Sequence, residues 1–312
     1  MKAANVVNFS RNVPRTWEEC LNRFLTARRR QGLSARTLLD HERVIEMFFR
    51  RYPTAWSGTC QDCLDAFLGQ PGISPTTHNI RLKSLRPFFD FAAREGAFST
   101  SPADGFKYRR GEEPRIVDLP LADVKKVLDV IGTGTFVRLR DSALLLFSID
   151  SGIRPSEALS LRVSDVNTLS GKAAIKAVSA KTRRPRMVYF TQPTAALIER
   201  LIDFRPPEWN SAVPLFCTTY GDQWNTHAWS VQLRRYGRKA GLRRLSAYDL
   251  RHMHALESLR NGANVFTLQR TMGHAQLSMT EKYLALSDED LQHAHQESSP
   301  INALLPAPRR RA

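Results

Sequence analysis

A polar, basic stretch divides this sequence into two parts with different patterns. Residues 103–118, ADGFKYRRGEEPRIVD, combine charged side chains with glycine and proline. This composition is typical of a linker, because glycine and proline interrupt helices and strands. The chain has 312 residues, which is long enough for a hydrophobic core on each side of the linker. We therefore expect two domains.

The first part is expected to be all helical. Thr16 begins a capping box, T-W-E-E, and Ser34 precedes a second amphipathic pattern. A third pattern, SPTTHNIRLKSLRPFFDFAAREG, contains Pro87, which we expect to kink or shorten the helix. The sequence thus predicts a flexible N-terminus over residues 1–13 and a helical domain over residues 14–102.

The second part, residues 119–290, adds short strands to helices. Residues 173–178 and 186–190 are apolar and flank a polar turn, which predicts an antiparallel hairpin. The expected fold class is therefore mainly α with a small antiparallel β-sheet, an α+β domain that follows an all-helical one. Residues 291–312 hold prolines and an arginine triplet, and they predict a flexible basic tail.

Charge restricts the class of partner. The net charge is +16 and the pI is about 10.2, which favours an anionic partner, most often nucleic acid. No apolar run reaches the roughly 20 residues that span a bilayer, so we expect a cytoplasmic protein without a membrane partner. Cys60 and Cys63 form a C-x-x-C without a second pair at zinc spacing, so we expect no metal and no cofactor; the role of these cysteines stays open.

Two segments place basic residues near element ends. In SGIRPSEALSLRVSDV, Arg154 follows a long apolar helix, and Glu157 is three residues further on. A buried arginine needs a partner, so an Arg154–Glu157 pair is expected, and for this segment taken alone a purely structural pair is the better explanation. In AKTRRPRMVYF, the predicted hairpin turn carries four cations that suit a DNA groove or a solvated turn. These cations are Lys181, Arg183, Arg184 and Arg186.

Two later segments carry histidine, arginine and tyrosine. LSAYDLRHMHALESL places Arg251 and His252 next to each other in a helical pattern. TMGHAQLSMTEKYL places His274 nine residues before Tyr283. A lone tyrosine on an amphipathic helix usually belongs to a core or an interface. Together with the other three segments, however, Tyr283 is better interpreted as a reactive residue than as a core residue.

Two arginines, a lysine, a histidine and a tyrosine suit the transfer of a phosphodiester to a protein hydroxyl. Guanidinium groups bind the extra negative charge of the transition state, and they do so bidentately. A tyrosine oxygen is a suitable nucleophile when a neighbour helps it to lose its proton, because its ordinary pKa is near 10. A lysine can protonate the departing 5′ oxygen. This chemistry requires no metal.

In this order and with these separations, the four segments resemble the sequence boxes of the tyrosine recombinases, the phage-integrase and Xer-like family. The third pattern of the first part also resembles the last helix of that family's N-terminal core-binding (SAM-like) domain. The resemblance covers nearly the whole chain. It assigns catalytic roles to Arg154, Lys181, Arg251, His274 and Tyr283, and supporting roles to Glu157 and His252.

One position departs from the family pattern. Tyr248 stands three residues before Arg251, where the family usually has histidine. A phenol can hydrogen-bond a phosphate, but it is a poor general base at neutral pH. We therefore expect Tyr248 to bind the scissile phosphate, while His274 or His252 carries more of the proton transfer. Whether the change lowers activity stays open.

The resemblance implies a site-specific DNA recombinase that forms a 3′-phosphotyrosine intermediate, with its two domains clamped around duplex DNA. Integration, excision and resolution of mobile DNA or replicon dimers are all compatible with it. A catalytically impaired DNA-binding member and a type IB topoisomerase-like enzyme are the alternatives. The expected DNA contacts outside the second part are Thr77, Arg81, Lys83 and Arg86, with Lys107, Arg109 and Arg110 in the linker.

The resemblance also implies an assembly. Four protomers would act on two DNA sites, with residues 291–312 of one protomer docking on the next. A second recombinase or an accessory DNA-binding protein is a further expected partner, and the expected location is the bacterial nucleoid. Because the segment before Trp17 is short, we expect a simple Xer-like or transposon-borne member rather than a lambda-type integrase. The sequence does not specify the DNA target.

Overall fold

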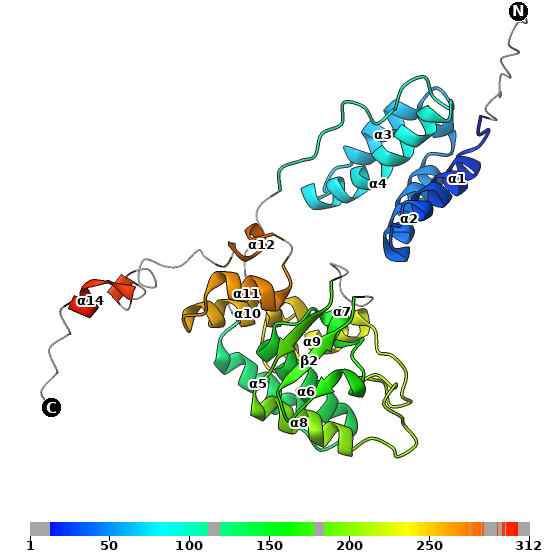
Figure 1. The fold of residues 1–312 in the computed structure, drawn as a ribbon. Helices are drawn as coiled ribbons and strands as arrows, with labels where there is room; N and C mark the ends of the chain where they lie inside the picture. The colour runs from blue at the N-terminus through cyan, green and yellow to red at the C-terminus, as the bar shows by residue number, and fades with distance from the viewer. Residues whose placement is uncertain are drawn as a thin grey trace, which may run out of the picture. The chain divides into compact units, whose positions relative to one another are not determined.

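The chain forms two compact units, Met1–Pro114 and Arg115–Ala312, which are considered separately below (Figure 1). The structure is a computed structural model. It describes residues 13–111, 119–177, 184–274, 276–281, 283, 292, 295–296 and 298–304. None of the helices in these ranges is long and apolar enough to cross a membrane.

The described part of the N-terminal unit is helical. Its elements are α1 (Trp17–Arg30), α2 (Ala35–Arg51), the 3-10 helix η1 (Pro53–Trp56), α3 (Cys60–Leu68) and α4 (Pro75–Arg94). Hydroxyl caps begin three of these helices, because Thr16, Ser34 and Ser74 each accept a hydrogen bond from the backbone N–H three residues later. The capping box at Thr16 is only half formed, since the Glu19 carboxylate accepts from the N–H of Arg15 instead.

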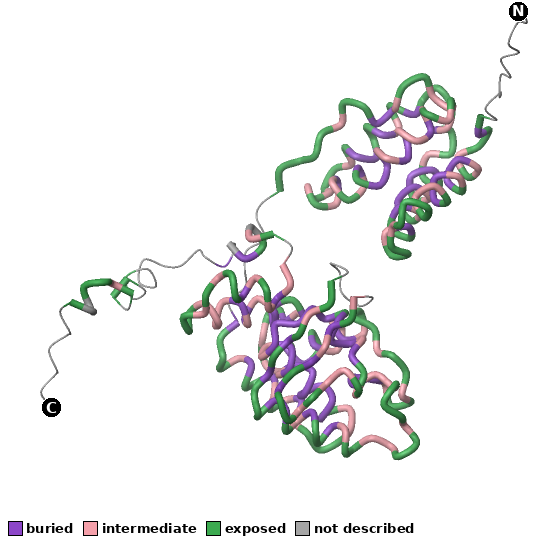
Figure 2. Tube along the Cα trace, in the orientation of Figure 1, coloured by how far each residue is buried: buried purple, intermediate pink, exposed green. Residues whose placement is uncertain are grey.

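Aromatic packing holds this unit together. Phe48, Phe49, Phe88 and Phe89 have at most 1% of their surface exposed, and they meet edge-on across α2 and α4. Figure 2 shows the buried positions as stripes along the facing sides of these helices. Helix α4 continues through Pro87 to Arg94, so the expectation that Pro87 shortens the helix is wrong. Burial of the two phenylalanines directly after the proline offsets the lost backbone hydrogen bond.

The described part of the predicted linker is packed against α4. The side-chain amide of Asn79 donates to the carbonyl of Arg109 and accepts from its N–H, both at 2.8 Å. The Arg86 guanidinium donates to the carbonyl of Phe106. Residues 103–111, the described part of the predicted linker over 103–118, therefore belong to the N-terminal unit.

The C-terminal unit combines helices with one small sheet, as predicted. Its helices are α5 (Leu121–Ile131), α6 (Phe136–Ser151), α7 (Pro155–Ala158), the 3-10 helix η2 (Val163–Asp165), α8 (Gln192–Asp203), α9 (Thr226–Lys239), α10 (Ala247–Arg260), α11 (Val265–Met272), α12 (Ser278–Glu281) and α14 (Ile301–Leu304). The sheet is antiparallel, with the order β1 (Val166–Asn167), β2 (Lys172–Ile175) and β3 (Arg186–Tyr189). The hairpin of β2 and β3 was predicted, whereas β1 was not.

Helix α6 lies at the centre of this unit. Phe147 is fully buried and packs against Phe190 and Phe216, and α8 and α10 flank the helix. The helix ends at Gly152, which is left-handed with φ 59°. A Cβ there would lie 2.3 Å from the ring of His254, so only glycine fits. The end of α6 at Gly152 therefore fixes where the backbone segment that carries Arg154 begins.

A buried polar network joins α6 to α9. Asp141 is completely buried, and its carboxylate accepts hydrogen bonds from Arg140 and, at 2.8 Å, from the hydroxyl of Tyr236. Burial raises the pKa of Tyr236 to about 12, and the neighbouring Asp141 charge adds to this effect. The tyrosine therefore stays protonated and acts as a hydrogen-bond donor.

We predict that Tyr236→Phe lowers the free energy of unfolding by about 1–3 kcal/mol, because it leaves a buried carboxylate oxygen without a partner. Urea unfolding followed by circular dichroism measures this change. Tyr220→Phe is the matched control, since Tyr220 is 86% exposed and its substitution should leave stability unchanged. Equal stability of the two variants would contradict the prediction.

Candidate active site

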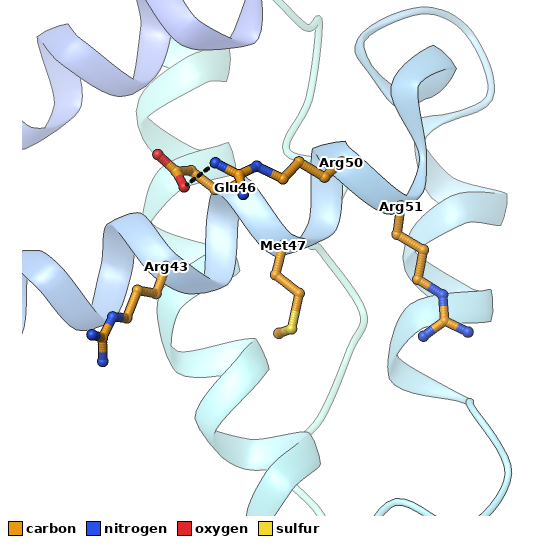
Figure 3. Close-up of a pocket in the computed structure, with 5 residues that line it drawn as sticks. All are labelled: Arg43, Glu46, Met47, Arg50 and Arg51. Carbon is orange, nitrogen blue, oxygen red and sulfur yellow. Dashed lines mark hydrogen bonds and ion pairs between the residues drawn. The ribbon is translucent and has the colours of Figure 1, made fainter.

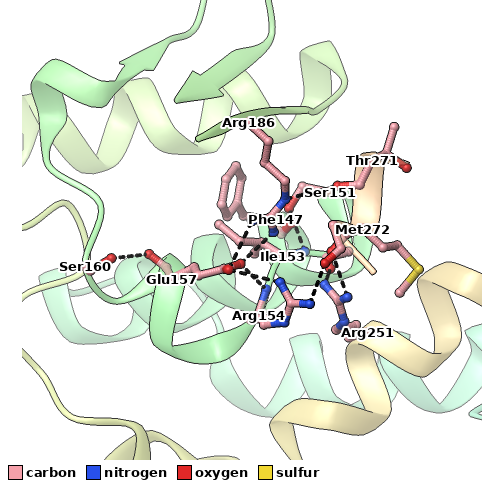
Figure 4. A network of polar contacts seen from close by, with 12 residues as sticks. Phe147, Ser151, Ile153, Arg154, Glu157, Ser160, Arg186, Arg251, Thr271 and Met272 are labelled. Carbon is pink, nitrogen blue, oxygen red and sulfur yellow. Dashed lines mark hydrogen bonds and ion pairs between the residues drawn. The ribbon is translucent and has the colours of Figure 1, made fainter. Parts of the chain in front are cut away.

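Two of the predicted arginines and Glu157 meet in the interior of the C-terminal unit. Arg154 precedes α7 and Arg251 lies in α10; they are 7% and 4% exposed, and Glu157 has no exposed surface. The Arg154 Nη1 donates to Glu157 Oε1 at 3.1 Å, so the predicted ion pair is present (Figure 4). Arg251 donates instead to the carbonyls of Gly152 and, at 2.9 Å, Met272.

Arg186 joins this cluster rather than the hairpin turn. It begins strand β3, and its guanidinium donates to both carboxylate oxygens of Glu157, at 3.0 and 2.6 Å. Its side chain is 11% exposed. The sequence predicts Arg186 as a DNA contact, and the structure pairs its guanidinium with Glu157. Sequence reasoning grouped Arg186 with its basic neighbours and missed that a strand directs alternate residues to opposite faces.

The charges in this cluster are strongly coupled. Burial alone raises the pKa of Glu157, but the hydrogen bonds and charges of Arg186 and Arg154 outweigh it and hold that pKa below its usual value. Burial lowers the pKa of Arg251 to about 10, with the positive charge of Arg154 adding to the effect. At neutral pH the group thus consists of three guanidinium cations around one carboxylate.

Tyr283 lies beside these arginines with its hydroxyl hydrogen-bonded. It is 5% exposed, and it packs with Ala255, Leu268 and Met272 in a small apolar cluster separate from the main core. Its Oη lies 2.6 Å from Nδ1 of His252. Burial raises the pKa of Tyr283, and the positive charge of Arg251 opposes this. A neutral phenol next to an imidazole is the arrangement required for assisted deprotonation.

Both histidines near Tyr283 are held neutral. Burial lowers the pKa of His252, and Arg251 and Arg244 add to this although Asp249 opposes it. Burial and the nearby arginines lower the pKa of His274 to about 4. The ring of His274 is parallel to that of Tyr283 at 6.5 Å, and its Nδ1 is hydrogen-bonded to the Thr280 hydroxyl at 2.8 Å. His252, rather than His274, contacts the phenol oxygen.

Two further predicted site residues, Tyr248 and Arg184, are exposed in the structure. Tyr248 lies in the first turn of α10 and is 60% exposed. Arg184 is exposed just before β3. Lys181 and Arg183 fall outside the described residues.

In the N-terminal unit, some of the predicted DNA contacts already bind the protein itself. The hydroxyl of Thr77 is hydrogen-bonded to Ser74. Arg81 donates to the carbonyl of Phe67 at 2.7 Å and stacks on its ring, while Arg86 lies 5.1 Å from the ring centre of Tyr108. The guanidinium of Arg109 donates to the Leu68 carbonyl at 3.3 Å. The exposed members of the predicted set in this unit are Lys83, Lys107, Arg109 and Arg110.

Sequence reasoning missed a basic face on α2. Figure 3 shows Arg43, Met47 and Arg51 on the same side of this helix, where they line a shallow hollow of about 450 Å³ with Glu46 and Arg50. The spacing of four residues was visible in the sequence, because side chains at i, i+4 and i+8 share one face of a helix. The sequence pattern identified only the apolar residues on the opposite face of this helix.

The described residues contain no group of histidine, cysteine, aspartate or glutamate side chains placed to hold a metal ion. Cys60 and Cys63 are free thiols in α3, and burial raises the pKa of Cys60 to about 12. The buried cluster itself supplies guanidinium cations, one carboxylate, neutral imidazoles and a phenol.

Comparison with known proteins gives concordant matches. The profile of the Phage integrase family matches residues 119–290. The tyrosine recombinase XerD of Listeria innocua is 25% identical over 284 residues, which are 86% of this chain and 94% of the relative. The tyrosine recombinase XerC of Pelobacter propionicus is 27% identical over 279 residues, covering 86% of this chain and 91% of the relative.

Solved structures share the fold. The Tn1549 transposon integrase in complex with a circular intermediate DNA superposes with a TM-score of 0.68 at 18% identity, over 89% of this chain and 98% of that one. A lambda integrase dimer bound to a core site gives 0.65 at 14% identity, over 85% and 76% of the two chains. The family profile covers more than half of the sequence, including every described residue of the buried cluster, and the chain therefore belongs to the phage integrase family of tyrosine recombinases.

Proposed function

We propose that this site-specific DNA recombinase uses Tyr283 as its nucleophile. The observation that carries this assignment is the 2.6 Å contact between Tyr283 Oη and His252 Nδ1, beside two buried arginines. The phenol oxygen attacks the scissile phosphorus, and the bond from phosphorus to the 5′ oxygen breaks. The products are a 3′-phosphotyrosine and a free 5′ hydroxyl. Because the phosphotyrosine conserves the energy of the broken bond, a second 5′ hydroxyl can reverse the step without an added energy source.

The hydrogen bond between Tyr283 and His252 also indicates where the phenol proton goes during the attack. The phenol donates its hydrogen bond to Nδ1 of His252 when that ring carries its own hydrogen on Nε2, so His252 takes the proton as attack proceeds. Lys181 protonates the leaving 5′ oxygen, a role that rests on the resemblance of its segment to the family's hairpin box. Arg154 and Arg251 bind the non-bridging oxygens, and His274 assists them as a neutral donor. Tyr248, exposed at the start of α10, hydrogen-bonds the phosphate.

The partner is double-stranded DNA. The net charge of +16 and the arginines on the exposed face of α2 support binding along phosphate backbones. In the assembly that we propose, four protomers hold two sites, and residues 291–312 dock on a neighbouring protomer. Within that tail, α14 exposes Ile301 and Leu304, which are 52% and 73% accessible, and such apolar side chains suit docking into another chain. The substrates are recombination sites of mobile DNA or of replicon dimers.

We predict that wild-type protein forms an SDS-resistant adduct with a nicked suicide duplex from DNA that flanks the gene, whereas Tyr283→Phe forms none. The phenylalanine lacks only the attacking oxygen, so DNA binding should persist. Denaturing gels measure the adduct, and a native shift on the same duplex is the binding control. Binding by wild type without any adduct would contradict the assignment of Tyr283.

We predict that His252→Ala slows adduct formation by about 10²- to 10⁴-fold, the range for loss of a general base. His252 must be neutral to accept the proton, and burial lowers its pKa below 6.5, so the wild-type rate should fall with acidity only below that pH. The rate constant at subsaturating protein, measured across pH, reports this pKa. An acid limb that His252→Ala leaves in place would contradict the role of His252 and favour His274, with its pKa of about 4.

We predict that deletion of residues 291–312 leaves binding to a single site and adduct formation intact but abolishes strand exchange between two sites. The reason is that the deletion removes the docking segment and leaves the described active-site residues in place. Native shifts and a two-plasmid recombination assay separate these steps. Unchanged recombination by the truncated protein would contradict the docking role of the tail.

A further inference from the structure

The C-terminal end of α11 is a junction for three arginines. Its last carbonyl groups have no partner within the helix, and they carry the negative end of the helix dipole. Three successive carbonyls each accept a hydrogen bond from a different arginine. The pairs are Arg186 Nε with Thr271 at 3.4 Å, Arg251 Nη2 with Met272 at 2.9 Å, and Arg154 Nη2 with Gly273 at 2.7 Å. Figure 4 shows these guanidinium groups converging on the end of the helix.

Two of these three arginines, Arg186 and Arg154, also bind the carboxylate of Glu157. Arg186 uses two nitrogens to bind both carboxylate oxygens, whereas the side chain of Arg154 reaches Oε1 with Nη1 alone, at 3.1 Å. The backbone N–H of Arg154 completes the set by donating to Oε2 at 3.2 Å. Arg186 is therefore the main side-chain partner of the carboxylate, and Arg154 is the lesser one.

The way in which Arg186 and Arg154 share the Glu157 carboxylate determines whether the Arg154 guanidinium can bind the substrate phosphate. A buried carboxylate must be compensated, because an unpaired charge in the interior is costly. Among the described residues, Arg154 supplies the guanidinium that stays on Glu157 when Arg186 is removed. The carboxylate would then draw Arg154 toward itself and neutralise it. With Arg186 present, the group of three cations and one anion keeps a net positive charge for a phosphate.

Gly273 allows the side chain of Arg186 to pass close to the end of α11. Its φ is +66°, and a Cβ there would lie 2.8 Å from Nε and 2.9 Å from Cδ of Arg186. The glycine therefore allows both the left-handed end of α11 and the passage of the Arg186 side chain next to it. The same residue offers its carbonyl to Arg154, so one backbone position sets the places of two arginines.

Arg186 has no role in the mechanism described above. We propose that Arg186 is a positioning residue for the cleavage step: by occupying Glu157 and the end of α11, it holds the Arg154 guanidinium in place and charged toward the scissile phosphate. This inference rests on the proposed function, since it assigns the same reaction a residue that acts through Arg154.

The test compares two substrates under single turnover. One is the nicked suicide duplex with a normal scissile phosphodiester, and the other carries a neutral methylphosphonate at that position. The full-length wild type, Arg186→Met and Arg186→Lys are used at saturating protein. A misplaced Arg154 costs most where the transition state is most negative. We expect Arg186→Met to slow cleavage of the phosphodiester on the order of 10- to 100-fold and cleavage of the methylphosphonate by a clearly smaller factor.

Arg186→Lys should retain part of the phosphodiester rate, because lysine keeps the charge but cannot bind both carboxylate oxygens. If Arg186→Met does not fold, the lysine variant carries the same two-substrate comparison. Arg205→Met is the matched control, since Arg205 is a partly buried arginine of the same unit that donates to the carbonyls of Pro214 and Leu215 away from the cluster. It should lower the melting temperature without changing the ratio of the two cleavage rates.

Two outcomes would overturn the inference while leaving the proposed function intact. One is an Arg186→Met variant that cleaves the phosphodiester as fast as wild type. The other is an equal loss on both substrates, which indicates a merely structural role. Absence of an adduct with wild type overturns the proposed function instead, and the inference falls with it.

Discussion

The arrangement of the site depends on the burial of one negative charge. Glu157 has no exposed surface, and the cost of removing a carboxylate from water is met only by partners that surround it closely. Those partners are Arg154, which directly precedes α7, and Arg186 on β3. Folding cannot bury Glu157 without bringing these elements together. The carboxylate therefore links the stability of this region to the assembly of its arginine cluster, before any DNA is bound.

The sequence indicated the helical and mixed parts, the hairpin and the Arg154–Glu157 pair, because each depends on local spacing. Periodic apolar residues identify helices whatever they pack against, and a carboxylate three residues after an arginine lies within reach of it. The place of Arg186 depends on strand register and on which face of the sheet lies inside. The contact of His252 with Tyr283 depends on how Tyr283, which lies beyond the end of α12, packs against α10. Neither fact can be obtained from the spacing of residues along one element.

The basic residues of the N-terminal unit differ in their contacts. Arg81 and Arg109 are both predicted DNA contacts, and each donates to a main-chain carbonyl of its own unit. Arg43 and Arg51 on α2 were passed over although their spacing was regular. Charge alone does not separate an arginine that compensates backbone carbonyls from one that faces solvent. That distinction depends on tertiary contacts, which composition does not encode.

Tyr283 belongs to a small apolar cluster with Ala255, Leu268 and Met272, apart from the core built around α6. A cluster of this size stabilises its segment much less than the main core stabilises the rest of the unit. The contacts of Tyr283 can thus open locally at a lower cost in free energy than unfolding of the core around α6. Heating is therefore expected to disturb the nucleophile before it melts the unit, so cleavage should fail at a lower temperature than global unfolding.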